Sequence, residues 1–244
     1  MKTAIISDIH ANFAALKSVL AKIDAIKCDR IICCGDLIGY GADANEVIDL
    51  VKNVSALTIR GNHEIAVLDP RQAETFNTIA REALFWTRSE LTVENNDFLR
   101  NLRDQEQLDD IILAHGSLLD PDEYIYTPLQ AGKSLEIAPC RITAVGHTHY
   151  PEIYRYMPST GLCRDLIASE GFIELEEGYR YLINAGSAGQ PRDGDWRASF
   201  AVYDDGGSGA IELVRVDYDV HATMDSIKKA GLPEMLADRL LEGR

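Results

Sequence analysis

The chain has 244 residues, and its composition excludes several broad classes of protein. Hydrophobic residues make up 46% and charged residues 26%, which is close to the globular average and unlike a disordered, collagen-like or disulfide-scaffold protein. The 39 acidic and 24 basic side chains leave a net charge of -15, which repels nucleic-acid backbones and anionic membranes. We therefore expect one domain over residues 1–244, with neither nucleic acid nor membrane as a partner.

We expect a cytoplasmic protein, because the sequence shows neither a signal-like nor a membrane-spanning pattern and its cysteines are not spaced as disulfide pairs. Asp8 and His10 interrupt the first apolar run before it reaches signal length. Nowhere do about 18 apolar residues run together, as a membrane-spanning helix requires. The five cysteines make an odd count without paired spacing, and we expect them to be buried and reduced: Cys28, Cys33, Cys34, Cys140 and Cys163.

The first half of the chain alternates strand-like and helix-like patterns. Short apolar, β-branched runs predict strands at 2–7, 31–34, 57–59 and 111–114. Apolar residues at helical spacing predict helices at 12–23, capped by Asn12, and at 46–51. Two more helical patterns between 75 and 103 carry no strand signal and predict an inserted helical pair. The fold class is therefore α/β.

After Pro139 the pattern becomes rich in short strands separated by Gly, Pro and Asp turns. The predicted strands are 142–145, 153–156, 179–183, 200–203 and 211–216. The polar, glycine-rich residues 204–209 predict a hairpin between the last two. A helical segment, broken near Pro233, is expected over 224–241.

Histidines gather at the ends of predicted strands. Five of the six directly follow a strand: His10, His63, His115, His147 and His149. Three further polar side chains that could bind a metal occupy the same kind of position: Asp8, Asp36 and Asn62. Because the carboxyl ends of strands in α/β sheets form one ligand-binding edge, these side chains can converge there.

The mixed nitrogen and oxygen donors suit divalent transition metals better than magnesium alone. The set is too large for one ion, but it matches two ions that share a bridging carboxylate. A single strand-end histidine is more often a hydrogen-bonded surface residue, and a lone Gly-Asp or Gly-Asn pair is usually a turn. To explain the whole set without a metal, a separate ordinary explanation would have to apply at every one of these positions. The set as a whole therefore favours a metal site.

The blocks occur in an order that resembles the calcineurin-like metallophosphoesterase superfamily. They read Asp8-Ile9-His10, Gly35-Asp36, Gly61-Asn62-His63-Glu64, His115-Gly116 and Gly146-His147-Thr148-His149. The resemblance implies a double β-sandwich flanked by helices, in four layers α/β/β/α, with a dinuclear metal centre at one edge. It further implies that Asp8, His10 and His149 hold one metal. Asn62, His115 and His147 would hold the second, Asp36 would bridge the two, and His63 would face the substrate.

The chemistry implied by that resemblance is phosphoester hydrolysis. Two ions about 3.5 to 4 Å apart clamp the phosphoryl oxygens, and a metal-bridging hydroxide attacks phosphorus in line. His63 would stabilise the transition state and protonate the leaving oxygen, or alternatively only orient the site. Manganese, iron, zinc, nickel and cobalt all suit such donors, and we favour manganese.

The Gly-Asp block favours a small organic phosphodiester as the substrate. The chain also resembles protein serine/threonine phosphatases at residues 60–64, but residues 35–41 lack the phosphate-gripping arginine of those enzymes. A guanidinium fork matters most for a doubly charged monoester. Residues 39–41 and 184–192 are similar to small bacterial and archaeal members described as phosphodiesterases or phosphatases. Candidate substrate contacts are Asn12, Tyr40 and Arg192, although Asn12 could serve only as a helix cap.

Other functions remain open at this point. The same metal clamp would serve a phosphomonoesterase or a nucleotide pyrophosphohydrolase. A catalytically silent binding module would be expected to have lost ligands, whereas all seven ligands and His63 are present. A nuclease would need a basic groove, which the acidic composition does not indicate.

Overall fold

The computed structural model describes residues 1–54 and 56–244, and two six-stranded sheets form its centre. The first sheet has the strand order β3-β2-β1-β11-β12-β9 and the second β4-β5-β6-β10-β7-β8. The strands of the first are β1 (Lys2–Ile6), β2 (Arg30–Cys33), β3 (Leu57–Thr58), β9 (Gly171–Glu174), β11 (Ala198–Asp204) and β12 (Ala210–Val216). The strands of the second are β4 (Gln105–Leu108), β5 (Ile111–Ala114), β6 (Ile142–Val145), β7 (Pro151–Met157), β8 (Leu162–Ala168) and β10 (Arg180–Ala185).

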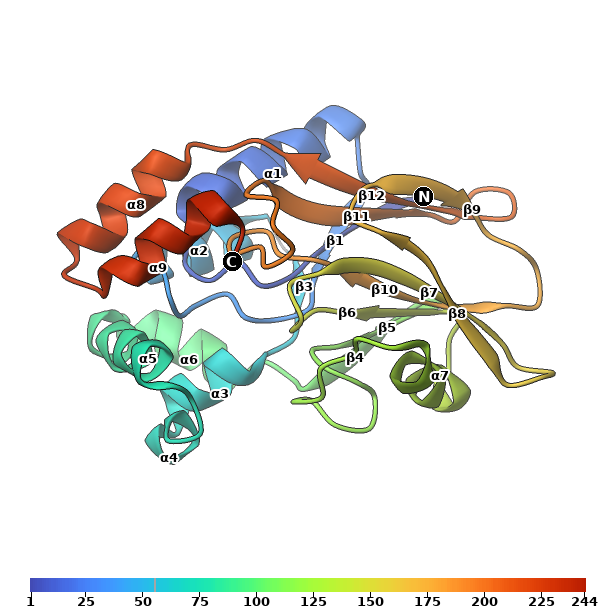
Figure 1. The fold of residues 1–244 in the computed structure, drawn as a ribbon, viewed down its shortest axis with the longest axis horizontal. Coiled ribbons are helices and arrows are strands. Elements are labelled where there is room, and N and C mark those ends of the chain that lie inside the picture. The colour runs from blue at the N-terminus through green and yellow to red at the C-terminus, as the bar shows by residue number, and fades with distance from the viewer. Residues whose placement is uncertain (55) are drawn as a thin grey trace.

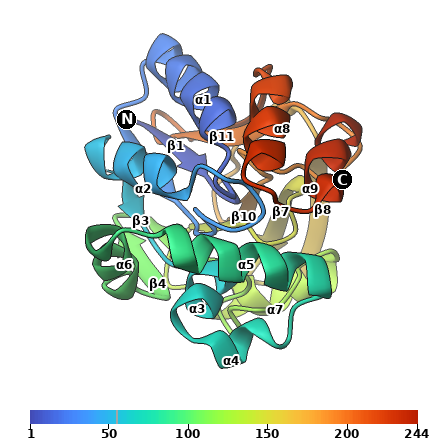
Figure 2. The ribbon, with the colours of Figure 1, turned by 90° about the vertical axis from the view of Figure 1, so that its left-hand side faces the viewer.

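Helices cover the outer faces of both sheets. α1 lies over the first sheet, with α8 beside it beyond the ends of the strands, and α7 lies under the second sheet, whereas α3 to α6 gather beside the ends of the strands (Figures 1 and 2). Their bounds are α1 (Phe13–Ile26), α2 (Ala44–Asn53), α3 (Asn62–Leu68), α4 (Pro70–Ala73), α5 (Thr78–Glu90), α6 (Val93–Arg100), α7 (Pro128–Ile137), α8 (Val220–Lys229), α9 (Glu234–Asp238) and the 3₁₀ helix η1 (Arg239–Glu242).

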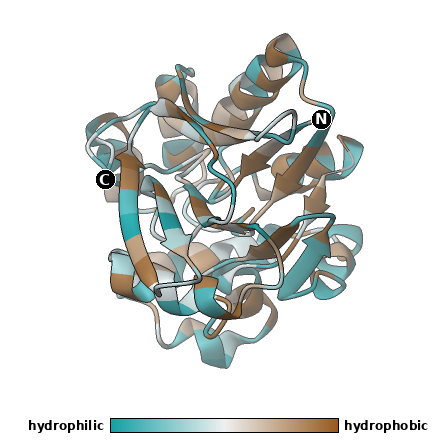
Figure 3. Ribbon diagram, turned by 90° about the vertical axis from the view of Figure 1, so that its right-hand side faces the viewer, coloured by the Kyte–Doolittle hydropathy of each residue, from teal (hydrophilic) through white to brown (hydrophobic). Residues whose placement is uncertain are grey.

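The core consists of three apolar layers, because side chains of a strand alternate between the two faces of its sheet. On β1, Ala4 and Ile6 pack toward the helices of the first sheet, whereas Ile5 packs between the sheets. Tyr154 and Leu182 of the second sheet pack against α7. The central strands are coloured mainly hydrophobic, whereas the outer helices carry hydrophobic and hydrophilic segments side by side (Figure 3). The predicted four-layer α/β/β/α architecture is confirmed.

All the predicted strands occur in the structure, and the 204–209 hairpin joins β11 to β12. The predicted helical pair appears as α5 and α6. The last helical segment begins at Val220, four residues earlier than predicted, because Asp219 caps it by accepting a hydrogen bond from the amide of Ala222. The prediction missed β4, β8, β9, α3, α4 and α7. β4 and β9 alternate between exposed and half-buried positions, so they carry a weak apolar signal.

The cysteine prediction is partly wrong. Cys33, Cys34 and Cys140 are buried, but Cys28 and Cys163 are only half-buried, and all five are free thiols. Cys28 follows the end of α1, and Cys163 lies on the outer strand β8, where solvent reaches them. No helix among the described residues is long and apolar enough to cross a membrane.

Candidate metal centre

The polar loops that follow five strands meet at one edge of the two sheets. β1, β2 and β3 run parallel in the first sheet, as do β5 and β6 in the second, so their carboxyl ends point the same way. Backbone hydrogen bonds join the loops: the amide of Asp8 donates to Gly35 at 3.0 Å, and that of Gly146 donates to His115 at 3.0 Å. The amide of His147 donates to the Asp8 carboxylate at 3.0 Å and so connects the two sheets.

Backbone strain is concentrated in these loops. Asp8, His10, Asp36, His147 and His149 all have left-handed conformations, with φ between 49° and 69°. This region costs an L-residue roughly 1–2 kcal/mol. Such strain persists only where the surrounding structure enforces it, and it is typical of functional sites.

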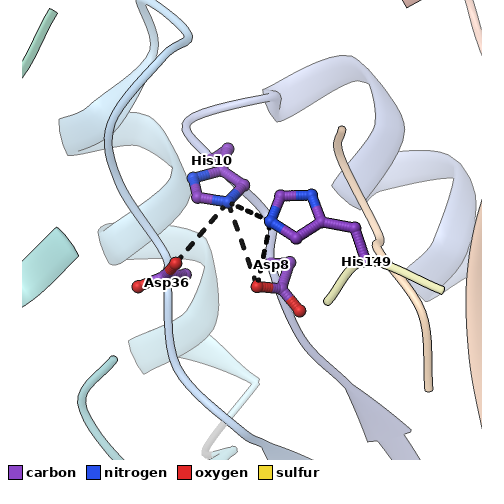
Figure 4. A group of neighbouring side chains, drawn as sticks. All are labelled: Asp8, His10, Asp36 and His149. Atoms are coloured by element: carbon purple, nitrogen blue, oxygen red, sulfur yellow. Dashed lines mark hydrogen bonds and ion pairs between the residues drawn. The ribbon is translucent and has the colours of Figure 1, made fainter. Parts of the chain in front are cut away.

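The first group of facing side chains consists of Asp8, His10, Asp36 and His149, all buried (Figure 4). One potential ligand atom from each lies within 4.8 Å of the others. The Nε2 atom of His10 is 3.1 Å from Nε2 of His149 and 3.6 Å from Oδ2 of Asp36. The Nε2 atom of His149 is 3.4 Å from Oδ1 of Asp8.

The second group consists of Asp36, His115 and His147, also buried. The Nε2 atom of His115 is 3.3 Å from Oδ2 of Asp36 and 3.1 Å from Nδ1 of His147. Oδ1 of Asn62 lies 3.2 Å from the same Nε2 atom. The seven side chains predicted as ligands therefore meet in two adjoining groups, and the same Oδ2 atom of Asp36 faces both.

Backbone carbonyls determine which nitrogen of each histidine faces the centre. Nδ1 of His10 faces the carbonyl oxygen of Ile38 at 3.0 Å, Nδ1 of His115 faces that of Cys34 at 2.7 Å, and Nδ1 of His149 faces that of Gln190 at 2.5 Å. His147 is reversed, with Nε2 facing the carbonyl of Asp122 at 3.2 Å. Because a carbonyl only accepts, each of these nitrogens donates its proton outward. The other nitrogen of each ring then points to the centre.

This arrangement fits a cation. His10 and His149 bring two Nε2 lone pairs to 3.1 Å, and in the neutral rings neither can donate, because their protons lie on Nδ1. The neighbouring carboxylates of Asp8 and Asp36, when ionised, supply further acceptors. Two facing acceptors repel unless a positive charge lies between them. A histidine whose second nitrogen donates to a carbonyl is also the usual form of a metal ligand.

The protonation states of three of the four histidines agree with this interpretation. Burial holds the pKa of His10 and His149 well below the ordinary histidine range, and it lowers the pKa of His147 to about 3. Burial also opposes charge on His115, but the carboxylate of Asp36 outweighs that effect and raises the pKa of His115 to about 10. At pH 7 three imidazoles are therefore neutral with free lone pairs. Without a cation, His115 keeps its proton beside Asp36, and burial raises the pKa of Asp8 to about 7, so metal binding would have to release protons from this centre.

Glu64 organises the loops that carry Asp36 and Asn62. Its buried carboxylate accepts hydrogen bonds from the amides of Asp36 at 2.8 Å, Leu37 at 2.8 Å and Gly61 at 2.7 Å. The amide of His63 donates in turn to Oδ1 of Asp36 at 2.9 Å. The sequence shows Glu64 beside Asn62 and His63, but its role depends on contacts 28 residues away in the chain.

The loop at 184–192 supports the centre from the second sheet. The side-chain amide of Asn184 donates to the carbonyl of Gly146 at 2.8 Å and the hydroxyl of Thr148 at 2.9 Å. The hydroxyl of Ser187 donates to the carbonyl of Asp8 at 2.6 Å. These bonds hold the backbone that presents Asp8, His147 and His149.

A cavity of about 530 Å³ opens over the centre. Its walls include Asp36, Asn62, His147 and His149 from the two groups. The predicted substrate residues His63, Tyr40 and Arg192 line it as well. The ring of His63 is buried, and its Nδ1 atom has no hydrogen-bond partner among the described residues.

Asn12 is placed differently from the other predicted substrate residues. It is buried and does not belong to the described walls of the cavity. Its side chain accepts from the amide of Ala15 at 3.0 Å and the hydroxyl of Thr223 at 2.7 Å, and it donates to the carbonyl of Gly189 at 2.7 Å. The structure therefore shows Asn12 as a helix cap that connects α1, α8 and the loop at 184–192.

Sequence reasoning missed several residues of the cavity wall. The ring of Phe76 meets the ring of His63 edge-on, with 5.0 Å between the ring centroids. The ring of Tyr124 stacks on that of His147, with 3.8 Å between the centroids. Arg239 enters the wall from the 3₁₀ helix η1 near the end of the chain. No local sequence signal marks these three residues, because they belong to elements distant from the metal-binding blocks.

Comparisons with known proteins agree with this site. The model of the calcineurin-like phosphoesterase superfamily domain matches residues 1–205. An uncharacterized protein from Methanocaldococcus jannaschii is 36% identical to the chain over 99% of its length and 98% of that protein. The crystal structure of a metallophosphoesterase from Sphaerobacter thermophilus is 34% identical and superposes with a TM-score of 0.86 over 100% of both chains.

A hypothetical protein from Pyrococcus horikoshii shares the fold at 21% identity, with a TM-score of 0.81 over 100% of this chain and 98% of that one. The family match covers every block of the predicted site, from Asp8 to His149. The buried aspartates and histidines at the strand ends supply donors for a metal. The chain therefore belongs to the calcineurin-like phosphoesterase superfamily, and it is a metal-dependent hydrolase of phosphoric esters.

Proposed function

We propose that the chain is a single-domain, dinuclear phosphodiesterase that hydrolyses a small organic phosphodiester. The observation that carries this proposal is the position of Asp36, whose Oδ2 atom faces His10 in one group and His115 in the other. In this proposal Asp8, His10 and His149 hold one divalent transition-metal ion. Asn62, His115 and His147 hold the second, and Asp36 bridges them.

Manganese is our first choice of metal, because the mixed nitrogen and oxygen donors suit the divalent ions of the first transition row. When bound, two such ions neutralise phosphoryl oxygens and make water acidic enough to serve as a nucleophile at neutral pH. The chain supplies the geometry: carbonyl acceptors orient the histidines, and the amides around Glu64 hold the loop of Asp36.

His63 is the proposed donor to the leaving oxygen. Its ring lines the cavity next to Asn62. The centroid of this ring lies 4.6 Å from that of Tyr40 and 5.0 Å from that of Phe76. Burial lowers the pKa of His63 to about 4, so the ring is neutral at pH 7 and keeps one N–H to donate. An anionic phosphoester in the cavity would raise that pKa, because a nearby negative charge favours the imidazolium.

Arg192 is the proposed contact for a non-scissile oxygen of the phosphodiester. Its guanidinium lines the cavity and donates to the hydroxyl of Tyr40 at 3.3 Å. It thus supplies the cation that residues 35–41 lack. A phosphodiester carries one charge, and a single guanidinium beside two metals is sufficient for it.

The test begins with metal-stripped protein to which manganese is returned. Initial rates are then compared on bis(p-nitrophenyl) phosphate and p-nitrophenyl phosphate. We expect faster turnover of the diester, and we expect Asp36→Asn to lower kcat/KM by more than about a hundredfold, because it removes the shared ligand. Asp225→Asn, an exposed position on α8, is the matched control and is expected to retain the wild-type rate.

Two results would contradict the proposal. Faster hydrolysis of the monoester would favour a phosphomonoesterase. No hydrolysis of either ester with manganese, iron, zinc, nickel or cobalt would favour the binding module or an enzyme with a narrow substrate range. The cytoplasmic location and the absence of a nucleic-acid partner stay predictions from the sequence.

A further inference from the structure

Two guanidiniums at the cavity have no acidic partner. Arg192 and Arg239 both line it, and neither has a carboxylate within 4.0 Å among the residues that the structure describes. The chain has 39 acidic side chains against 24 basic ones. Arginines without a carboxylate partner are therefore unexpected in this protein. The Nε and Nη2 atoms of Arg239 are buried and make no hydrogen bond within the described chain. These two atoms are enclosed by the protein, so it is the positive charge and the remaining part of the guanidinium that face a ligand in the cavity.

Arg239 also borders a second, smaller cavity of about 260 Å³. This side cavity shares Tyr40, Asn77 and Arg239 with the main one. Its remaining walls include the first turn of α5, from Thr78 to Ala80. The Asn77 side chain already accepts from the amide of Ala80 at 3.0 Å, so what the helix offers this space is the positive end of its dipole, beside the Arg239 guanidinium.

The end of the chain is held so that Arg239 stays at this position. The side-chain amide of Gln190 donates to the carbonyl of Arg244 at 2.6 Å, and the amide of Gly194 donates to the carbonyl of Gly243 at 3.0 Å. Gly243 has φ +62°, and a Cβ there would come within 2.6 Å of the backbone nitrogen of Asp195. This close packing fixes the end of the chain beside the loop that carries Arg192.

Tyr40 connects the side cavity to the metal centre. The guanidinium carbon of Arg239 lies 4.4 Å from the Tyr40 ring centroid, and the His63 ring lies 4.6 Å from the same centroid. A substrate held at the metals can therefore extend past one tyrosine ring to reach Arg239. The segment that carries Arg239 lies beyond residues 1–205, the part that the family model matches.

We propose that Arg239 and the start of α5 bind a second phosphate group of the substrate. The substrate class is then a phosphodiester that bears a further phosphate on one of its arms. This inference rests on the proposed function, because the scissile phosphate must occupy the metal centre. It makes Arg239 a specificity-determining residue.

The test measures binding to manganese-loaded protein by calorimetry. Methylphosphonate is the probe with one anionic group, and methylene-, ethylene- and propylene-bisphosphonate are probes with two groups at increasing separation. We expect at least one bisphosphonate to bind about tenfold more tightly than methylphosphonate, and we expect Arg239→Gln to remove most of that preference, as loss of one charge-assisted contact would. Arg71→Gln, an exposed arginine of the neighbouring helix α4, controls for the loss of a positive charge and is expected to keep the preference.

The Arg239 guanidinium has no carboxylate partner and lies over the Tyr40 ring, so Arg239→Gln is expected to fold and to lose only the small stabilisation of that contact. Should that variant unfold, Arg239→Lys serves for the same comparison, and a weaker preference than wild type supports the assignment. An equal preference in wild type and in the Arg239 variant would overturn it while leaving the proposed function intact. Failure of the wild type to bind any of these phosphonates, together with no ester hydrolysis, would overturn both.

Discussion

The Nε2 atoms of His10 and His149 face each other at 3.1 Å, and the proton of each neutral ring lies on the opposite nitrogen. Carbonyl acceptors, at Ile38 and Gln190, determine this orientation. Folding alone gains nothing from two facing lone pairs. A cation between the rings would make the contact favourable, so the fold and the metal are expected to be thermodynamically linked.

The first prediction concerns metal removal. A metal that binds only the folded chain stabilises it by about 2.7 kcal/mol at a hundredfold excess over Kd. We therefore expect manganese to raise the Tm of chelator-treated protein and Asp36→Asn to reduce that rise, because Oδ2 of Asp36 faces both groups. Thermal unfolding across a manganese titration measures the effect. An equal rise in wild type and Asp36→Asn would count against a shared ligand at this position.

The second prediction concerns Glu64, which is buried and accepts amide hydrogen bonds at both of its oxygens. Glu64→Gln replaces one acceptor oxygen by an NH₂ group, which then faces amide donors. We expect a loss of roughly 1–3 kcal/mol in the free energy of unfolding, the cost of unsatisfied buried donors. Denaturant titration checks this, with the exposed Glu82→Gln on α5 as control. Equal stability of the two variants would show that Glu64 does not hold these loops.

The third prediction uses two glycines with similar backbone strain but different surroundings. A Cβ at Gly39 (φ +86°) would overlap Nδ1 of His63, whereas a Cβ at Gly178 (φ +81°) would meet no atom within 4 Å. Both alanine variants should lose stability, but only Gly39→Ala displaces His63. We expect kcat/KM to fall by about a hundredfold in Gly39→Ala, as for a small misplacement of a catalytic group, and to stay near wild type in Gly178→Ala. Similar activity of both variants would contradict a catalytic position for His63.

The fourth prediction concerns the pH dependence of stability. Hydrogen bonds from Arg197 hold the pKa of Asp195 below its usual value. A carboxyl whose pKa is depressed by folding contributes stability at a pH above its unfolded pKa, and that stability is lost as the pH falls through the folded value. Asp195→Asn should therefore cost about 1 kcal/mol at pH 7.

At pH 3 the difference between Asp195→Asn and wild type should shrink, because below about pH 3.9 the Asp195 carboxyl binds a proton in the unfolded wild type, which stabilises the unfolded state. Urea titrations at both pH values measure it, and Asp225→Asn serves as the exposed control. A difference that is the same at pH 7 and pH 3 would show that the charge of Asp195 contributes no stability.

Much of the fold was predictable from the sequence because its signals are local. Short apolar, β-branched runs indicate β1 and β6, and the polar, glycine-rich residues 204–209 indicate a turn between two strands. The histidines after these strands were predictable as one cluster, since parallel strands end at a common edge. The short strands β4 and β9 have no such signal, because half of their residues are exposed.

Which histidine nitrogen faces the centre was decided only by tertiary structure, since the carbonyl acceptors come from elements far away in sequence. Nδ1 of His115 faces Cys34, 81 positions earlier, and Nε2 of His147 faces Asp122. The left-handed backbone at Asp8 and Asp36 is likewise imposed by the surrounding packing, because the residues themselves disfavour it. Arg239 lines the cavity only because the chain folds back to bring η1 beside it, and no local sequence pattern predicts that placement. The residue types and their order thus follow from the sequence, whereas proton positions, strain and the distant arginine depend on long-range contacts.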